Sequence, residues 1–189
     1  MYKLCKSEQS ALRQRELEQQ LLNMMANLRF DEITVSDLCT QAEVSRKAFY
    51  RYFSGKEGAL YALIDHTLLE LESFPFDGMD SDGNLYRENM IWFFRFWQRQ
   101  KPLLDALDNS GIIEVLNQRV ALYAVESPRV MGAFFPYWEG EMKEYATTFG
   151  VFGMMSVIYS WYRSDFRQTP EQMADITVSL LTKPLIRIN

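Results

Sequence analysis

The sequence predicts an all-α protein with a small N-terminal domain and a larger C-terminal one. Apolar residues recur at steps of three and four along most of the chain, which is the period of one buried helix face. No run alternates between apolar and polar residues as a half-buried strand does. The 189 residues, 48% of them hydrophobic and 24% charged, suffice for a sizeable packed core.

Four helices are expected in the first third of the chain. Their apolar faces and breaks place them at residues 10–28, 35–42, 46–53 and 56–71. Thr34 and Ser45 precede the second and third helix as N-caps, because a hydroxyl there accepts a hydrogen bond from a free amide of the first turn. Glu43 and Val44 form the brief turn between these two helices, and Gly55 breaks the chain before the fourth.

The rest of the chain is also expected to be helical. Glycine, proline, aspartate and serine gather in residues 73–84, which we interpret as a domain boundary or a mobile loop. Further helices are expected at residues 85–100, 103–116, 140–164 and 170–181. Thr169 followed by Pro170 is a strong signal for the start of the last one.

Composition limits the classes of function. The N-terminus lacks an apolar signal core, and the longest apolar run, Phe149–Tyr162, has about 14 residues where about 20 span a bilayer, so a cytoplasmic protein is expected. Cys5 and Cys39 are too few for a disulfide framework or a zinc site, and His66 has no nearby ligand partners. We expect no metal, no other cofactor and no enzyme, since the chain also lacks a nucleophile elbow and a glycine-rich phosphate loop.

The segment Ser45–Lys56 is basic, although the whole chain has a formal charge of -5. It contains Arg46, Lys47, Arg51 and Lys56 and no acidic residue. Two short helices joined by a turn, the second bearing basic and aromatic side chains, match a helix-turn-helix whose second helix enters the DNA major groove. Because DNA binding requires local positive charge, we predict double-stranded DNA as a partner. The alternative is a solvent-exposed helix pair whose four basic side chains do not bind DNA.

Helical spacing separates the inner from the outer side chains of the third helix. Phe49 and Phe53 share one face and point inward with Leu38 and Val44. Side chains suited to phosphate oxygens are Thr34, Tyr50, Tyr52 and Lys56. Candidates for contacts with bases are Ser36, Arg46, Lys47 and Arg51.

These residues resemble the TetR family of one-component transcriptional repressors, in the version common in Firmicutes and related bacteria. The motif consists of Phe30, Thr34-Val35, Leu38, Ala42, Val44-Ser45, Phe49-Tyr50, Tyr52-Phe53, Lys56-Glu57 and Leu60. The resemblance implies a three-helix DNA-binding domain in residues 1–56 and a helical ligand-binding and dimerisation domain in residues 57–189. The DNA-binding residues are then Thr34, Ser36, Ser45, Arg46, Lys47, Ala48, Tyr50, Arg51, Tyr52 and Lys56.

Three positions depart from the family pattern. Glu43 replaces the usual glycine of the turn and places an acid near the phosphates. Ala48 replaces a frequent threonine and leaves a methyl group that can touch thymine, and Lys47 occupies a position that is often small. We therefore expect an unusual operator. The alternative is a helical interaction protein that retains the domain without specific DNA binding.

The resemblance implies a homodimer formed by the last two long helices. Two recognition helices about one DNA turn apart read a near-palindrome that neither holds tightly alone. The expected interface residues are Gly150, Gly153, Val157, Trp161, Met173, Ile176 and Leu180. A monomer that buries this face internally is the alternative.

Aromatic residues of the larger domain are candidates to line an apolar ligand cavity, or else to fill the core. The candidates are Trp92, Phe93, Arg95, Phe96, Trp97, Tyr123, Phe134 and Trp138. Arg95 is expected either to meet an anionic ligand group or to point to solvent. The resemblance implies that an unknown small-molecule effector shifts the fourth helix and releases the repressor from DNA. Repression and activation both stay open at this point.

Overall fold

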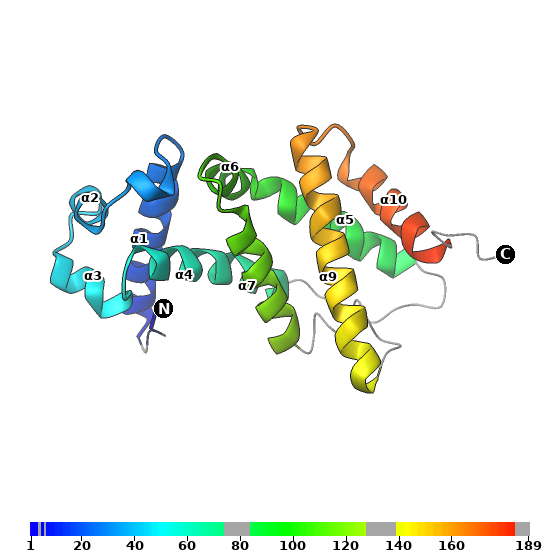
Figure 1. Ribbon diagram of the computed structural model, residues 1–189, viewed down its shortest axis with the longest axis horizontal. Coiled ribbons are helices and arrows are strands. Elements are labelled where there is room, and N and C mark those ends of the chain that lie inside the picture. The colour runs from blue at the N-terminus through cyan, green and yellow to red at the C-terminus, as the bar shows by residue number, and fades with distance from the viewer. Residues whose placement is uncertain (4, 6, 74–83, 128–138, 184–189) are drawn as a thin grey trace. The chain divides into compact units, whose positions relative to one another are not determined.

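The computed structural model describes residues 1–189 except positions 4, 6, 74–83, 128–138 and 184–189. Its elements are α1 (Glu8–Met25), η1 (Phe30–Glu32), α2 (Val35–Gln41), α3 (Arg46–Tyr52), α4 (Lys56–Leu69), η2 (Glu70–Ser73), α5 (Asn84–Arg99), α6 (Lys101–Asn109), α7 (Ile113–Glu126), α9 (Gly140–Arg163) and α10 (Pro170–Thr182) (Figure 1). The fold is all-α, as predicted: within the described ranges, extended pairing is limited to an isolated bridge between Tyr2 and Phe53. The loop expected at 73–84 lies outside the described residues except at its ends.

The chain divides into two compact units. The first comprises Met1–Glu70 and Pro102–Tyr123, and the second comprises Leu71–Lys101 and Ala124–Asn189. We predict that DNA binding ends and regulation begins after residue 56. This position falls inside the first unit, and the boundary stays a prediction.

In the first unit, α1 packs against α4 and α2, and α2 packs against α3 (Figure 1). Most side chains of the predicted inner faces are shielded from solvent, but Leu12 and Leu28, which the apolar spacing also assigned to the inner face of the first helix, are exposed. The core side chains include Leu17, Leu21, Met25, Leu38, Phe49, Phe53, Leu60 and Ile64. Because each such side chain contributes about 1.5–3 kcal/mol on burial, this core is sufficient to hold the short helices α2 and α3 in place.

Both predicted caps are present. The Thr34 hydroxyl accepts a hydrogen bond from the amide of Asp37 at 3.1 Å, and the Asp37 carboxylate accepts one from the Thr34 amide at 3.1 Å. Ser45 Oγ accepts from the amide of Ala48, also at 3.1 Å. These bonds satisfy amides that the first helical turn leaves without partners, which explains why helices of seven residues each begin where they do.

The helix that we predicted over residues 103–116 is in fact two helices. α6 ends at Asn109 and α7 begins at Ile113, with Gly111 at φ 68 between them. The amides of Gly111 and Ile112 donate to the carbonyls of Asp108 and Leu107, each at 2.9 Å, and so close the end of α6. Glycine adopts this left-handed conformation without steric cost, so the break follows from one residue that the prediction overlooked.

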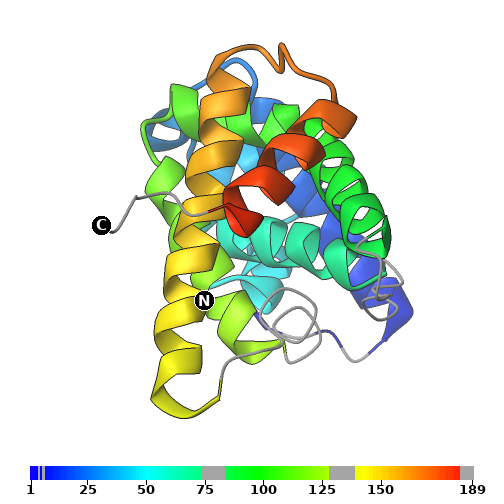
Figure 2. The same ribbon diagram turned by 90° about the vertical axis from the view of Figure 1, so that its right-hand side faces the viewer.

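In the second unit, α10 lies beside α5 (Figure 2), and Phe94 of α5 meets Trp161 of α9 edge to face at 5.4 Å between ring centres. Thr169 caps α10 and Pro170 is its first residue, as predicted. In the part of the chain that the structure describes, no helix combines the length and the apolar character needed to cross a membrane.

Candidate nucleic-acid interface

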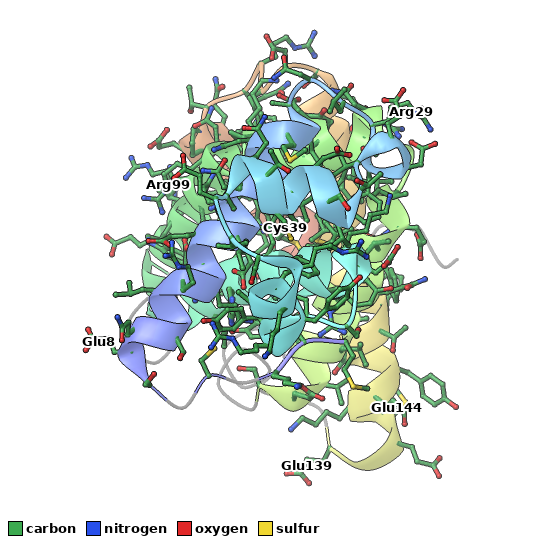
Figure 3. All side chains as sticks on the ribbon, turned by 90° about the vertical axis from the view of Figure 1, so that its left-hand side faces the viewer. Glu8, Arg29, Cys39, Arg99, Glu139 and Glu144 are labelled. Atoms are coloured by element: carbon green, nitrogen blue, oxygen red, sulfur yellow. The ribbon has the colours of Figure 1, made fainter. Side chains whose placement is uncertain are left out.

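Helix α3 has a buried aromatic face and an exposed basic one. Phe49 is fully buried, and its ring packs against Phe53 at 5.1 Å between centres. Arg46, Lys47 and Arg51 are exposed, together with Tyr50, whose exposed fraction is 44%. Figure 3 is seen from the side of α2 and α3, with the buried Cys39 labelled on α2. The predicted inner position of Phe49 and outer positions of Arg46, Lys47, Tyr50 and Arg51 are therefore confirmed.

Three other predicted DNA-binding residues lie in α2 and at the N-caps of α2 and α3. Thr34 and Ser36 are both exposed, and Ser45 is exposed at the start of α3. The Thr34 hydroxyl also donates to Asp37 at 2.6 Å, and this hydrogen bond lowers the pKa of the Asp37 carboxyl. Asp37 is thus an exposed anion beside Thr34, so a phosphate near this hydroxyl has to approach past a negative charge.

The turn between α2 and α3 keeps a left-handed backbone at Glu43, with φ 52. This is the position where the resembled family usually has glycine, which adopts such a conformation freely. For glutamate the same conformation costs about 1–2 kcal/mol. The substitution therefore leaves the turn intact and places an exposed acid beside the basic helix.

Lys56 is engaged within the protein. Its ammonium donates to the carbonyl oxygens of Phe30 at 2.7 Å, Asp31 at 3.1 Å and Ile33 at 2.7 Å. It also lies 4.7 Å from the centre of the Phe30 ring. Since an ammonium has three donors, Lys56 in this geometry fastens the segment before α2 to the start of α4 and has no spare N–H for a phosphate.

Tyr52 is another predicted phosphate residue that the structure places inside. Its exposed fraction is 9%, and the Arg51 guanidinium lies 5.8 Å from the centre of its ring. The structure thus brings Arg46, Lys47, Tyr50 and Arg51 to one surface and holds Tyr52 and Lys56 behind it. Ala48 is half-buried on the same helix.

Sequence reasoning missed a contact of the N-terminal segment with the end of α3. The amide of Lys3 donates to the carbonyl of Tyr52 at 2.9 Å, and the amide of Ser54 donates to that of Met1 at 3.0 Å. The signal was Gly58, a glycine inside a helix. A Cβ there would lie closer to the Met1 carbonyl oxygen than the 3.0 Å below which such contacts are essentially never seen.

Comparison with known proteins identifies this domain. Residues 30–63 match the family model described as bacterial regulatory proteins, tetR family. Residues 30–63 carry the N-terminal domain of TetR-family regulators. The chain is accordingly a transcription regulator of the TetR type, and DNA binding is the activity of the matched domain. The match covers α2, the turn and α3, together with Lys56 and the three carbonyls to which it donates.

Two solved structures share the fold. One is the fatty acid degradation regulator FadR from Bacillus halodurans, with a TM-score of 0.64 and 15% identity over 97% of this chain and 100% of that one. The other is the dihydroxyacetone kinase operon activator DhaS, with a TM-score of 0.64 and 14% identity over 90% of this chain and 94% of that one. No curated protein matches the sequence significantly.

The predicted pocket residues fall into separate environments. Phe93, Phe96 and Trp97 of α5 are buried among other rings, for example Phe93 against Trp97 at 6.3 Å between centres. Trp92 stacks on Phe96, whereas Arg95 is exposed and pairs with Glu171 at 2.5 Å. Tyr123 is half-buried in the first unit. Phe134 and Trp138 lie outside the described residues.

The predicted interface residues are largely brought together. A groove of about 290 Å³ runs between α9 and α10, and five of the seven line it: Val157, Trp161, Met173, Ile176 and Leu180. Gly153 is exposed and Gly150 half-buried further along α9.

Proposed function

We propose that the protein is a dimeric repressor that binds a near-palindromic operator and is released by a small ligand. The observation that carries this proposal is the exposed basic face of α3, formed by Arg46, Lys47, Tyr50 and Arg51 over the buried ring of Phe49. A helix so anchored presents donors to base edges and phosphates without losing its position. Residues 1–56 then read DNA and residues 57–189 regulate it.

Dimerisation is supported by an exposed stripe on α9. Met142, Tyr145, Phe149 and Phe152 recur at steps of three and four, and Phe149 has an exposed fraction of 73%. Gly153, Ser156 and Ser160 continue this exposed face, whereas Met155, Ile158 and Trp161 form the opposite, buried face. Large apolar side chains gathered on a surface are typical of an interface. A second copy of the chain covers them in the proposed dimer.

Helix α10 adds to the same proposal. Its outer residues Ile176, Leu180 and Leu181 are exposed by 41% or more, and two of them line the groove beside α9. A dimer that buries both helices places two copies of α3 on one DNA molecule. Because the two half-sites of such operators lie about 34 Å apart, the interface sets the spacing that the protein reads.

In the proposed mechanism, a small ligand binds within residues 57–189 and releases the protein from DNA. The two solved structures with this fold are described as a regulator of fatty acid degradation and as an operon activator, so the fold occurs in proteins that regulate genes of metabolism. A ligand that lowers operator affinity tenfold needs a differential binding free energy of about 1.4 kcal/mol.

The first test is binding of the purified protein to fragments of its own genome. The expected result is recovery of a near-palindromic site whose affinity falls steeply with salt, with a slope of about 0.9 for each phosphate neutralised. Arg46→Ala with Arg51→Ala should abolish this binding. Arg13→Ala, which removes an exposed arginine of α1 paired with Glu16, is the matched control and should leave it unchanged.

Weak binding without sequence preference, unaffected by the double substitution, would contradict the proposal. It would instead favour a helical interaction protein that uses the same fold. Sedimentation of the protein alone decides the oligomeric state independently, since a monomer at micromolar concentration is incompatible with the proposed operator reading.

A further inference from the structure

The N-terminal segment pairs with the chain just after the recognition helix. Besides the two backbone hydrogen bonds of Lys3 and Ser54, the Ser54 hydroxyl donates to the Met1 carbonyl at 2.8 Å, and Tyr2 forms an antiparallel bridge with Phe53. Gly58 leaves the space that this segment occupies over the first turns of α4. The end of α3 is therefore held from one side by residues 1–3.

The side chain of Tyr2 extends from this segment to the middle of α4. Its hydroxyl donates to Asp65 Oδ2 at 2.8 Å, and its ring meets that of His66 edge to face at 5.7 Å between centres. Burial, followed by the hydrogen bond to Asp65, raises the pKa of the Tyr2 phenol, so it stays a neutral donor. Tyr2 thus joins the end of α3 to the centre of α4.

Asp65 is shared with α7. Arg119 donates from Nε to Asp65 Oδ1 at 2.6 Å and from its second nitrogen to Asp65 Oδ2, so the guanidinium and the carboxylate form a bidentate pair. The Asp65 side chain is 12% exposed and that of Arg119 26% exposed. Paired charges in such partly buried positions have well-defined geometry, and removing one partner affects the groups around the other.

The neighbouring ionisable side chains form a separate cluster around Glu18. His66 Nδ1 lies 2.8 Å from the buried carboxylate of Glu18 on α1, and Arg15 lies 3.9 Å from the same carboxylate. Asp65 is therefore the carboxylate that connects α7 to the N-terminal segment. All of these residues belong to the first compact unit.

We propose that Tyr2, Asp65 and Arg119 form a latch through which the position of α7 controls how firmly the end of the recognition helix α3 is held. Tyr2 is a positioning residue in this latch: it acts on α3 through the backbone bonds at Tyr52 and Ser54. A movement of α7 that withdraws Arg119 leaves Asp65 with a single partner and loosens the segment that braces α3. The effect on transcription rests on the proposed function, whereas the mechanical link does not.

Amide hydrogen exchange of the full chain, without DNA, tests the link directly. The reporters are the amides of Lys3 and Ser54, which form the two backbone bonds of the segment. Tyr2→Phe and Arg119→Met should each speed exchange of both amides by roughly three- to tenfold, because each removes a charge-assisted hydrogen bond. The double variant should be little faster than either single one. Gln118→Ala, an exposed neighbour on α7, should change neither amide.

Two further variants keep the test decisive if Arg119→Met does not fold. Arg119→Lys retains the charge without the two parallel donors and should speed the same amides to a smaller extent. Gly58→Ala displaces the segment by a steric clash while leaving Asp65 and Arg119 paired, and it should also speed both amides. Unchanged exchange at Lys3 and Ser54 when Arg119 is altered would overturn the latch.

Binding to the strongest genomic fragment then separates the latch from the proposed function. Tyr2→Phe and Arg119→Met should each weaken this binding by roughly three- to tenfold at fixed salt, and their combination should be less than additive. If the unaltered protein binds no fragment while the amides respond as expected, the latch stands and the proposed function fails. If it binds and Tyr2→Phe leaves the affinity unchanged, the latch does not position α3 and is wrong.

Discussion

The ammonium of Lys56 donates a 2.7 Å hydrogen bond to the carbonyl oxygen of Ile33, two residues before α2 begins. Two further carbonyls in the same segment, those of Phe30 and Asp31, accept from the same nitrogen. A lysine predicted to contact phosphate is thus the clamp that fixes the path of the chain into the helix-turn-helix.

Lys56→Met is therefore expected to lower the free energy of unfolding by roughly 2 kcal/mol, because charge-assisted hydrogen bonds to three carbonyls are lost. Urea denaturation measures this loss. DNA affinity should fall with stability, but the slope of log affinity against log salt should stay the same. Arg51→Ala, an exposed arginine on α3, is the comparison: it should reduce that slope by about 1 with little effect on stability. A reduced slope for Lys56→Met would restore Lys56 as a phosphate contact.

Glu43→Gly is expected to stabilise the protein by about 1 kcal/mol. The residue adopts φ 52, and the strain of this conformation for glutamate exceeds the extra chain entropy that glycine loses on folding. Removing an exposed acid beside α3 should also strengthen DNA binding at low salt.

Glu43→Gln separates the two effects, since it removes the charge and keeps the strain. It should strengthen DNA binding as Glu43→Gly does, with stability unchanged. Thermal unfolding and a DNA titration check both outcomes. A loss of stability in Glu43→Gly would show that the glutamate side chain contributes a contact that the strain argument ignores.

Local signals account for what the sequence predicted well. Thr34 and Ser45 cap the helices that follow because each bond spans three residues, and the apolar spacing of α1 and α4 identifies their core faces. Five of the proposed interface residues line the groove between α9 and α10 because residues of one helix face stay together, and their role in a dimer stays a prediction.

Contacts between distant parts of the chain were not predictable in this way. The bonds of Lys56 join residues 23 or more positions apart, and that of Tyr2 to Asp65 spans 63 positions. Trp92, Phe93, Phe94, Phe96 and Trp97 share one broad side of α5, so spacing alone did not tell core from pocket. Arg95 was assigned two outcomes, and its pairing with Glu171 depends on where α10 packs.

Two exposed ion pairs between α5 and α10 predict loss of stability in acid. Hydrogen bonding to Arg87 lowers the pKa of Asp175, and bonds from its own backbone amide and from Arg95 lower that of Glu171. Because the carboxyl pKa values are depressed in the folded state, the contribution is present above the ordinary values of 3.8 and 4.5 and is lost as pH falls below them.

The double variant Asp175→Asn with Glu171→Gln should therefore show a smaller loss of stability below these values than the unaltered chain, measured by urea denaturation across pH. Glu144→Gln, at an exposed carboxylate near the start of α9 (Figure 3), is the control and should keep the original acid dependence. Equal acid sensitivity in all three proteins would mean that the ion pairs do not contribute.

Gly153→Leu should separate the proposed dimer from the fold of the single chain. A Cβ at Gly153 meets nothing within 4 Å in its own chain, so a larger side chain there has room in a monomer. Leucine also favours the helix by roughly 0.8 kcal/mol over glycine. In the proposed dimer the same side chain enters the surface next to Phe149 and Phe152, where the second copy packs.

The expected result is a folded monomer, with helix content unchanged by circular dichroism and at least a tenfold weaker dimer by sedimentation equilibrium. Operator affinity should fall with it, because half-sites are then bound singly. Glu144→Leu adds the same side chain to an exposed position of α9 off the apolar stripe and should leave the dimer intact. A Gly153→Leu protein that sediments as an unweakened dimer would place the interface elsewhere and leave the apolar stripe of α9 without its proposed partner.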